Sequence, residues 1–250
     1  MPKLTICMTY YQREKQLLKT LDSFRQYNYD FNVVIVDDNS PDDIKLPKDL
    51  TFDVTILKLR EKKWINPSAT FNVGFNYALK DNPDIIIIQN AECYHVGDII
   101  GYALKNVTAS NYITFAAYSL GEGQDVDFRG FVNAIPQFTG DSAWYNHSVY
   151  RPLAYHFCSV ITSANLRRIN GFEEAFAQGA AYEDDYFIHQ VRTAGLKVRI
   201  IDNPFVLHQW HYNVSAFHFT DKLVNGTLAL YNRLKAKNKF RAEHFVTPDL

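Results

Sequence analysis

The stretch Ile85-Ile86-Ile87-Ile88-Gln89-Asn90-Ala91-Glu92 decides how this chain folds. Four β-branched residues followed abruptly by polar ones predict a buried strand whose carboxyl end opens to solvent. Open α/β sheets bind their ligands at that end of their strands. Asn90 and Glu92 stand two residues apart, so an extended chain turns both side chains to the same side. The pair is therefore a candidate site for a divalent cation that holds a phosphorylated substrate.

The segments around this strand alternate between strand and helix. Strand patterns cover Leu4 to Met8, Phe31 to Val36, Asp53 to Leu59 and Asp84 to Ile88, and helix patterns cover Arg13 to Tyr27 and Ser68 to Leu79. Such alternation forms a parallel sheet with right-handed crossovers. We predict an α/β fold with a mostly parallel central sheet flanked by helices, of a nucleotide-binding type.

The second half of the chain is less regular. Further helices are predicted from Val96 to Asn106, from Ser163, from about Asp184 to Ala194 and from Asp221 to Lys235, and further strands from Tyr112 to Ala117, His156 to Thr162, Lys197 to Ile201 and Phe205 to His208. The stretch from Gly121 to Tyr150 shows no periodicity, and a loop of this length is usually functional or mobile. It carries Arg129, Trp144, Tyr145 and His147, which are side chains suited to a sugar.

Composition favours one soluble domain that acts on a small substrate. The 250 residues carry 26 Lys and Arg against 27 Asp and Glu, which gives no electrostatic reason to expect nucleic acid as a partner. The three cysteines are far apart and lack metal-ligand spacing, so a reducing compartment is expected. No apolar stretch suits a signal peptide or a transmembrane segment, and we expect a cytoplasmic protein.

A second polar cluster, Asp37-Asp38-Asn39-Ser40, follows the strand that ends at Val36. Its side chains could accept hydrogen bonds from a nucleotide base or a ribose. They are also turn formers, and Pro41 follows them, so a turn is the alternative interpretation.

Three consecutive carboxylates, Glu183, Asp184 and Asp185, stand at the predicted start of a helix. Acids in a first helical turn complement the helix dipole, which is one interpretation. Neighbouring carboxylates also raise one another's proton affinity, which suits a general base. Farther on, His208 and His211 follow a strand, and either is a surface histidine or an imidazole ligand of a metal.

In this order the motifs resemble those of the GT-A fold glycosyltransferases, in particular the inverting family-2 enzymes. The resemblance covers roughly Leu4 to His211. It rests on Thr9-Tyr10-Tyr11-Gln12-Arg13, Asp37-Asp38-Asn39-Ser40, Asn72-Val73-Gly74, Asn90-Ala91-Glu92, and the segment from Asn170-Gly171 to Glu183-Asp184-Asp185. It implies one GT-A domain over residues 1–250, with a nucleotide-binding part (about 1–118), an acceptor and catalytic part (about 119–212) and a C-terminal helix and tail (about 213–250).

The resemblance also implies roles for particular residues. Nucleotide binding, commonly of uridine, falls to Thr9, Tyr11, Arg13, Asp38, Arg60, Asn72 and Asn90. The family's metal-binding pair, Asp-x-Asp, is replaced here by Asn90-Ala91-Glu92, so Glu92 would hold Mn²⁺ or Mg²⁺ with help from Asn90, His208 or His211. The catalytic base would be Asp184, with Asp185 and Glu183 beside it.

The function expected from the resemblance is transfer of a sugar from a nucleotide-diphosphate donor, a UDP-sugar, to a hydroxyl of a glycan or another acceptor, with inversion. Trp144, Tyr145 and His147 would line the acceptor site. Two alternatives remain: an inactive nucleotide-binding or sugar-binding module of the same fold, and a sugar nucleotidyltransferase. The second needs a glycine-rich phosphate loop that the first strand lacks.

Overall fold

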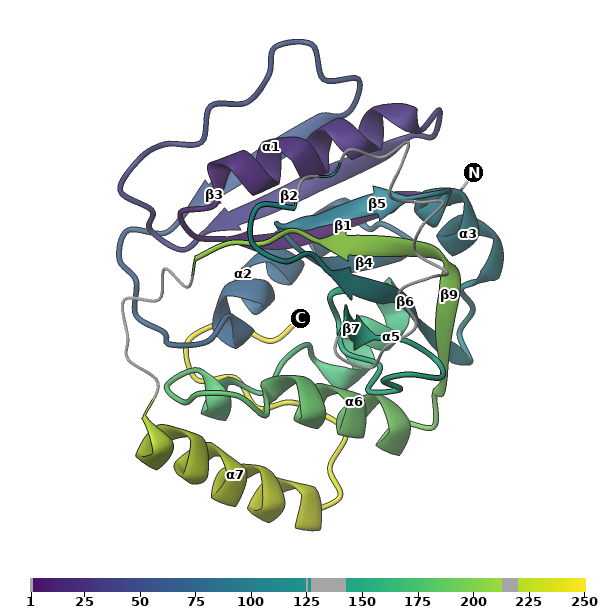
Figure 1. Cartoon of the computed structure of the whole chain (residues 1–250). Coiled ribbons are helices and arrows are strands. Elements are labelled where there is room, and N and C mark those ends of the chain that lie inside the picture. The colour runs from purple at the N-terminus through teal and green to yellow at the C-terminus, as the bar shows by residue number, and fades with distance from the viewer. Residues whose placement is uncertain (1, 125, 127–142, 213–219) are drawn as a thin grey trace.

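A computed structural model describes residues 2–124, 126, 143–212 and 220–250 of the chain. Its nine strands form one sheet in the order β3-β2-β1-β4-β8-β6-β9-β5, with β7 paired to β6 (Figure 1). The strands are β1 (Leu4–Tyr10), β2 (Phe31–Asp37), β3 (Asp53–Lys58), β4 (Ile85–Asn90), β5 (Cys93–Val96), β6 (Asn111–Ser119), β7 (Trp144–Asn146), β8 (Cys158–Thr162) and β9 (Lys197–His208). The helices are α1 (Glu14–Ser23), α2 (Ser68–Ala78), α3 (Ile99–Asn106), α5 (Ser163–Ile169), α6 (Glu183–Thr193) and α7 (Asp221–Ala236), with 3-10 turns η1 (Phe24–Gln26), η2 (Leu79–Asp81) and η5 (Glu174–Phe176).

The isoleucine run is β4, and it is buried on both faces of the sheet. Ile85 and Ile87 pack into the apolar layer that α1 and α3 cover. Ile86 and Ile88 point the other way, into the layer that α2, α5 and α6 cover. A strand sandwiched between two helical layers needs apolar side chains at every position, which explains the uninterrupted run. The predicted α/β architecture is confirmed.

The parallel half of the sheet aligns the polar ends of its strands. β1 pairs in parallel with β2 on one side and with β4 on the other. Thr9 lies beside Val36 in one pair and beside Asn90 in the other, and Tyr10 lies beside Asp37. The residues that follow β1, β2 and β4 therefore meet at one edge of the sheet, where the sequence predicted a ligand site.

The other half of the sheet is mixed. β8 runs antiparallel to β4 and to β6, whereas β9 runs parallel to β6. The two short strands predicted at 197–201 and 205–208 are one strand, β9, and its register shifts opposite Phe115 and Ala116. The helix predicted from Val96 begins at Ile99, because Asp98 caps it and Cys93–Val96 is a strand. That strand, β5, pairs with the end of β9 and sets Cys93 opposite His208.

The irregular stretch predicted from Gly121 to Tyr150 contains β7, whose Trp144 and Asn146 pair with β6. Trp144 is 4% exposed and packs edge-on against Tyr118, so an aromatic contact at the sheet edge fixes this strand. Arg129 lies outside the described residues.

The C-terminal segment returns to the body of the fold. α7 matches the predicted amphipathic helix and lies against α6 (Figure 1). Beyond it, the Oε2 atom of Glu174 accepts hydrogen bonds from the backbone N–H groups of Phe245, Val246 and Thr247, at 2.7, 2.8 and 3.3 Å. No described helix is both long and apolar enough to cross a bilayer.

Candidate active site

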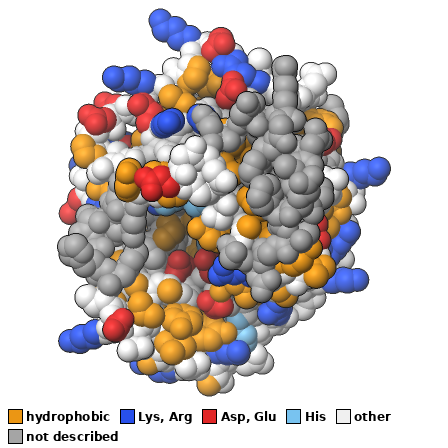
Figure 2. Space-filling view, viewed as in Figure 1, with side chains coloured by type: hydrophobic (Ala, Val, Ile, Leu, Met, Phe, Trp, Pro, Cys, Tyr) orange, Lys and Arg blue, Asp and Glu red, His pale blue; other side chains and the backbone are white. Residues whose placement is uncertain are grey.

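A pocket of about 270 Å³ opens at the carboxyl ends of β1, β2 and β4. Its walls are Thr9, Tyr10, Tyr11, Arg13, Asp38, Lys62, Ile65, Asn66, Pro67, Thr70, Asn90, Glu92, Ala181 and Glu183. These residues come from segments that are distant in the sequence, and the sheet edge and the start of α6 bring them together. On the face shown in Figure 2, acidic side chains gather beside a hollow.

One end of the pocket holds Asp38, Lys62 and Tyr11. Lys62 forms an ion pair with Oδ2 of Asp38, and its ammonium lies 4.6 Å from the centre of the Tyr11 ring. Burial raises the pKa of Asp38, and the Lys62 charge opposes that rise. The Oδ1 atom of Asp38 is buried and has no hydrogen-bond partner among the described residues, so it can accept a hydrogen bond from a ligand.

The turn interpretation of the Asp37-to-Ser40 cluster is confirmed for Asp37 and Asn39. Oδ1 of Asp37 accepts a hydrogen bond from the backbone N–H of Ser40 at 2.8 Å, and Asn39 has a φ of 62°. This is the side-chain-to-backbone turn that Asp and Asn favour. The turn leaves Asp38 on the pocket wall.

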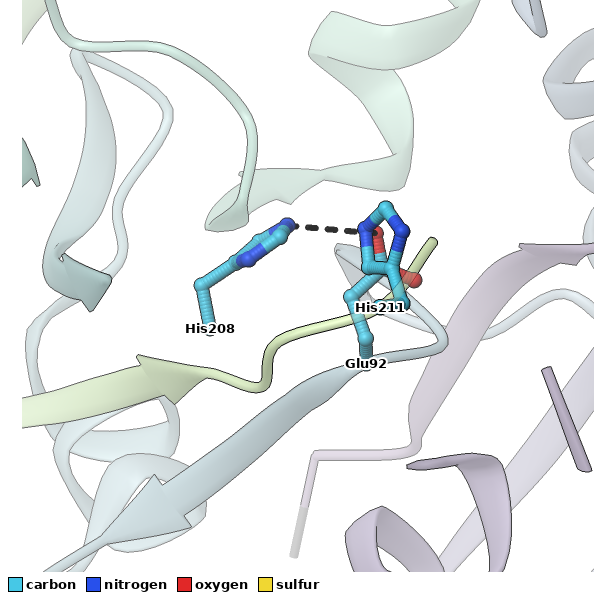
Figure 3. Close-up of side chains that lie close together, drawn as sticks. All are labelled: Glu92, His208 and His211. Atoms are coloured by element: carbon cyan, nitrogen blue, oxygen red, sulfur yellow. Dashed lines mark ion pairs between the residues drawn. The ribbon is translucent and has the colours of Figure 1, made fainter. Parts of the chain in front are cut away.

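At the other end of the pocket, Glu92 meets two histidines (Figure 3). Its Oε1 atom lies 3.2 Å from Nε2 of His208 and 3.6 Å from Nε2 of His211. The pairing of β5 with β9 produces this contact, because it sets Cys93 beside His208 and lets the N–H of Gln209 donate to the Glu92 carbonyl at 3.0 Å. One ligand atom from each of the three residues lies within 4.8 Å of the others.

Arg13 shares the same carboxylate oxygen, with its Nη1 atom 2.7 Å from Oε1 of Glu92. Burial by itself raises the pKa of Glu92, but Arg13 and the two histidines outweigh burial and hold it below its ordinary value. Burial, and then the Arg13 charge, lower the pKa of His211. At neutral pH the cluster therefore offers an ionised carboxylate and a neutral His211 imidazole, the forms that bind metals.

The acidic triplet stands at the start of α6, after two non-glycine residues in the left-handed region, Ala181 with φ 66° and Tyr182 with φ 69°. Such backbone strain concentrates at functional sites. The three carboxylates have different surroundings: Glu183 lines the pocket, Asp184 contacts Nδ1 of His156, and Asp185 accepts a 2.9 Å hydrogen bond from the Tyr155 hydroxyl. Burial, and then the charge of Asp184, raise the pKa of Glu183 to about 8.

Because the pKa of Glu183 is raised, we expect the free energy of unfolding to depend on pH. We expect Glu183→Gln to remove this dependence. Folded Glu183 keeps its proton up to about pH 8, whereas an unfolded chain loses it near the ordinary value of 4.5. The wild type therefore loses stability as pH rises between these values, by at most about 1.4 kcal/mol per pH unit. We expect the free energies of unfolding in urea to match within about 1 kcal/mol at pH 5, and the variant to be more stable by up to about 4 kcal/mol at pH 8. A difference that does not change with pH would contradict this.

Seven of the residues predicted for nucleotide, metal or catalytic roles line the pocket: Thr9, Tyr11, Arg13, Asp38, Asn90, Glu92 and Glu183. Arg60 is exposed and does not line it. Asn72 is fully buried in α2 and lies outside it.

Asn72 joins α2 to the segment after α5. Its amide N–H donates to the Phe172 carbonyl at 2.8 Å and to Glu174 at 3.2 Å, and its Oδ1 accepts from the Phe172 N–H at 2.9 Å. We expect Asn72→Ala to lower the free energy of unfolding by about 2–4 kcal/mol, because it leaves buried polar groups unpaired. UDP affinity, measured by calorimetry on the folded variant, should stay within about twofold. A selective loss of UDP affinity at unchanged stability would instead support the nucleotide-binding role.

The three predicted acceptor residues have separate surroundings. Trp144 is a core residue of the sheet edge. His147 lies 3.7 Å from Asp202, and its Nδ1 accepts from the Val149 N–H at 3.1 Å. The ring of Tyr145 lies 4.9 Å from that of His208, which places it beside the Glu92 cluster. Of the three, Tyr145 is the residue whose ring lies beside a candidate metal ligand, His208.

Several residues at the site carry no motif that sequence analysis could find. Lys62, Asn66 and Thr70 line the pocket, and His156 and Tyr155 contact the acidic triplet. Lys62 lies in an irregular segment after β3, and Tyr155 and His156 precede β8. Their roles depend on which elements they face in the folded chain. The spacing of residues in the sequence does not predict those contacts.

Comparisons with known proteins agree with this geometry. The family model described as Glycosyl transferase family 2 matches residues 5–160. No curated protein matches the chain. Among solved structures, S. aureus TarS 1-349 is 14% identical with a TM-score of 0.64, over 97% of this chain and 67% of that one. The same fragment in complex with UDP-GlcNAc is 13% identical with a TM-score of 0.66, over 97% and 68%.

A further crystal structure of S. aureus TarS is 14% identical with a TM-score of 0.56; the match covers 83% of this chain and 37% of that one. At such identities the likeness shows the fold alone. The sheet, and the pocket at the carboxyl ends of its parallel strands, define a glycosyltransferase of the GT-A fold. The chain belongs to glycosyl transferase family 2. The acidic triplet and both cluster histidines lie beyond the matched residues, so their roles rest on the geometry of this chain.

Proposed function

We propose that the protein transfers a sugar from a UDP-linked donor to an acceptor hydroxyl, with inversion at the anomeric carbon and with the help of a divalent cation. The observation that carries this proposal is the single pocket that Tyr11, Asp38, Glu92 and Glu183 all line. The bound UDP-GlcNAc in the S. aureus TarS complex supports UDP as the nucleotide.

The Asp38 end of the pocket suits a nucleoside. The Tyr11 ring provides an apolar face for the base, and the free Oδ1 atom of Asp38 can accept a hydrogen bond from the base or from a ribose hydroxyl. Lys62 now occupies this end, paired with Asp38. Its flexible side chain can move toward the diphosphate when the nucleoside enters, because an ammonium is a good phosphate partner.

The Glu92 end suits a divalent cation. The donor set of one carboxylate and two imidazoles fits a transition metal such as Mn²⁺ better than Mg²⁺, which prefers oxygen ligands. Glu92, His208 and His211 would hold the ion, and Asn90 stands on the same pocket wall. A cation held there would neutralise charge on the departing diphosphate. Arg13 now neutralises Glu92 and would be released to face the phosphates.

Inversion follows if one carboxylate removes the acceptor proton during a direct displacement. The acceptor oxygen attacks the anomeric carbon, the bond from that carbon to the diphosphate oxygen breaks, and the acceptor proton passes to Asp184. Glu183 is less suited to this task, because its raised pKa keeps it protonated at neutral pH. Asp185 is already occupied as the acceptor of the Tyr155 hydroxyl.

A second hollow on the far side of the acidic triplet suits the acceptor. It measures about 330 Å³ and is lined by Pro152, Leu153, Tyr155, Asp185, Ile188, His189, Arg192, Tyr231 and Lys235. Glu183 lines the donor pocket and Asp185 lines this hollow, so the acidic triplet adjoins both, and Asp184 is the residue next to each of them in the sequence. The two tyrosines offer faces for sugar stacking. We propose this hollow as the acceptor side of the site.

The test is release of free nucleotide from a panel of UDP-sugars, beginning with UDP-GlcNAc, in the presence and absence of Mn²⁺. A transferase releases UDP, slowly to water and faster when its acceptor is added. A nucleotidyltransferase would instead form pyrophosphate from UTP and a sugar phosphate. Binding of UDP-sugars without release of either product would identify a binding module.

A further inference from the structure

His156 lies in a cage of aromatic side chains directly behind the acidic triplet. The residue is 5% exposed. Its ring centre lies 5.0 Å from that of Phe71, 4.8 Å from that of Phe172 and 6.4 Å from that of Phe187, each in an edge-to-face arrangement. These three phenylalanines come from α2, from the segment after α5 and from α6, and each is at most 1% exposed. The cage therefore holds the imidazole in one orientation.

The imidazole has one polar contact in this cage. Its Nδ1 atom touches Oδ1 of Asp184. Both atoms are buried, and neither has a hydrogen-bond partner among the described residues, so the two atoms are in contact without hydrogen-bond geometry. Burying a polar ring among aromatic residues costs free energy unless the ring is paired. A phenylalanine would fill the same space without that cost, so packing alone does not account for a histidine here.

The contact leaves the two oxygens of Asp184 unequal. Oδ1 is buried against His156, yet 26% of the Asp184 side chain is exposed. Oδ2 is therefore the oxygen that an acceptor can reach. An aspartate side chain that is held at neither oxygen can change rotamer, so the orientation that presents Oδ2 is fixed only while Oδ1 is held.

We propose that His156 is a positioning residue for the transfer reaction: a small adjustment of the Asp184 carboxylate lets Nδ1–H of His156 donate to Oδ1, which directs Oδ2 at the acceptor hydroxyl. This inference rests on the proposed function, in which Asp184 takes the acceptor proton. His156 touches neither donor nor acceptor and acts only through Asp184. Small displacements of a reacting group can cost about 10²-fold in rate, which is the size of effect expected from its loss.

The kinetic test compares three variants by UDP release from UDP-GlcNAc, or from whichever UDP-sugar is turned over. His156→Phe keeps the ring and removes the donor, and we expect kcat to fall about 10–100-fold with KM for the donor within about twofold. His156→Asn places an amide N–H where Nδ1 stands, and should recover kcat to within about fivefold of wild type. Phe172→Leu loosens the cage but leaves the pair intact, and should keep kcat within about threefold. A His156→Phe variant with wild-type kcat, or equal losses in all three variants, would overturn the proposal.

A second measurement tests the pair without any activity. A hydrogen bond from Nδ1 to a carboxylate shifts the imidazole N–H proton strongly downfield in the NMR spectrum. We expect such a resonance in the wild type and its absence in both His156→Phe and Asp184→Ala. If no UDP-sugar is turned over, the proposed function fails, while this resonance still decides whether His156 holds Asp184. Its absence from the wild type would refute the pairing even in an active enzyme.

Discussion

Asp184→Asn is expected to reduce sugar transfer by about 10³-fold or more, because an amide cannot take the acceptor proton and general-base catalysis contributes about 10²–10⁴-fold. Affinity for UDP, measured by calorimetry with Mn²⁺ present, should stay within about twofold, because Asp184 does not line the donor pocket. The loss should therefore appear in kcat and leave KM for the donor nearly unchanged.

Asp185→Asn is the matched control for this prediction. It is the adjacent residue on the same helix, it carries the same charge, and Asn keeps an oxygen that can accept the Tyr155 hydroxyl. We expect it to retain kcat within about tenfold of wild type. Full activity in Asp184→Asn combined with a large loss in Asp185→Asn would move the base to the neighbouring residue.

Glu92→Ala is expected to remove the dependence of UDP binding on Mn²⁺. In the wild type we expect Mn²⁺ to tighten UDP binding by at least about tenfold, since two imidazoles without the carboxylate form a much weaker site. Without metal, UDP affinity should not fall in the variant, because Arg13 loses its carboxylate partner and becomes free to face the diphosphate.

Titrations of UDP with and without Mn²⁺ check this prediction, on wild type, Glu92→Ala and His189→Ala. His189 is a histidine outside the cluster, and its replacement should leave the metal effect intact. Equal metal dependence in wild type and Glu92→Ala would show that the cation binds elsewhere. No metal effect in the wild type would favour Arg13 as the cationic group that meets the diphosphate.

Local sequence was enough to predict the parallel half of the fold. The four isoleucines of β4 indicate a strand that is buried on both faces, and the alternation of strand and helix indicates a parallel sheet. Both patterns can be recognised from residues that are neighbours in the sequence. The same patterns placed Asp38, Asn90 and Glu92 just past strand ends, because parallel strands in one sheet must end at one edge. Six of the predicted site residues, Thr9, Tyr11, Arg13, Asp38, Asn90 and Glu92, line the pocket for this reason, and Glu183 reaches it from the start of α6.

The sequence was a poorer guide where contacts are long-range. The sequence pattern does not predict the strand Cys93–Val96, and it places the last residue of that strand at the start of a helix. A four-residue strand has too little periodicity to be recognised. Trp144 looked like a sugar-binding side chain in a long loop, yet pairing of β7 with β6 buries it. Asn72 lies in a motif of the family and is fully buried, with its amide bonded to Phe172 and Glu174.

The sequence by itself determined that this chain forms an α/β sheet with acidic and amide side chains at the ends of its parallel strands. Local sequence patterns are enough to predict which segments are strands and which faces are buried. Only the tertiary structure decided which partners those side chains have. The register of β5 against β9 brings His208 and His211 to Glu92, and the contact of α6 with the segment before β8 brings His156 to Asp184. Contacts between distant segments depend on the register and angle of packed elements, which no short stretch of sequence specifies.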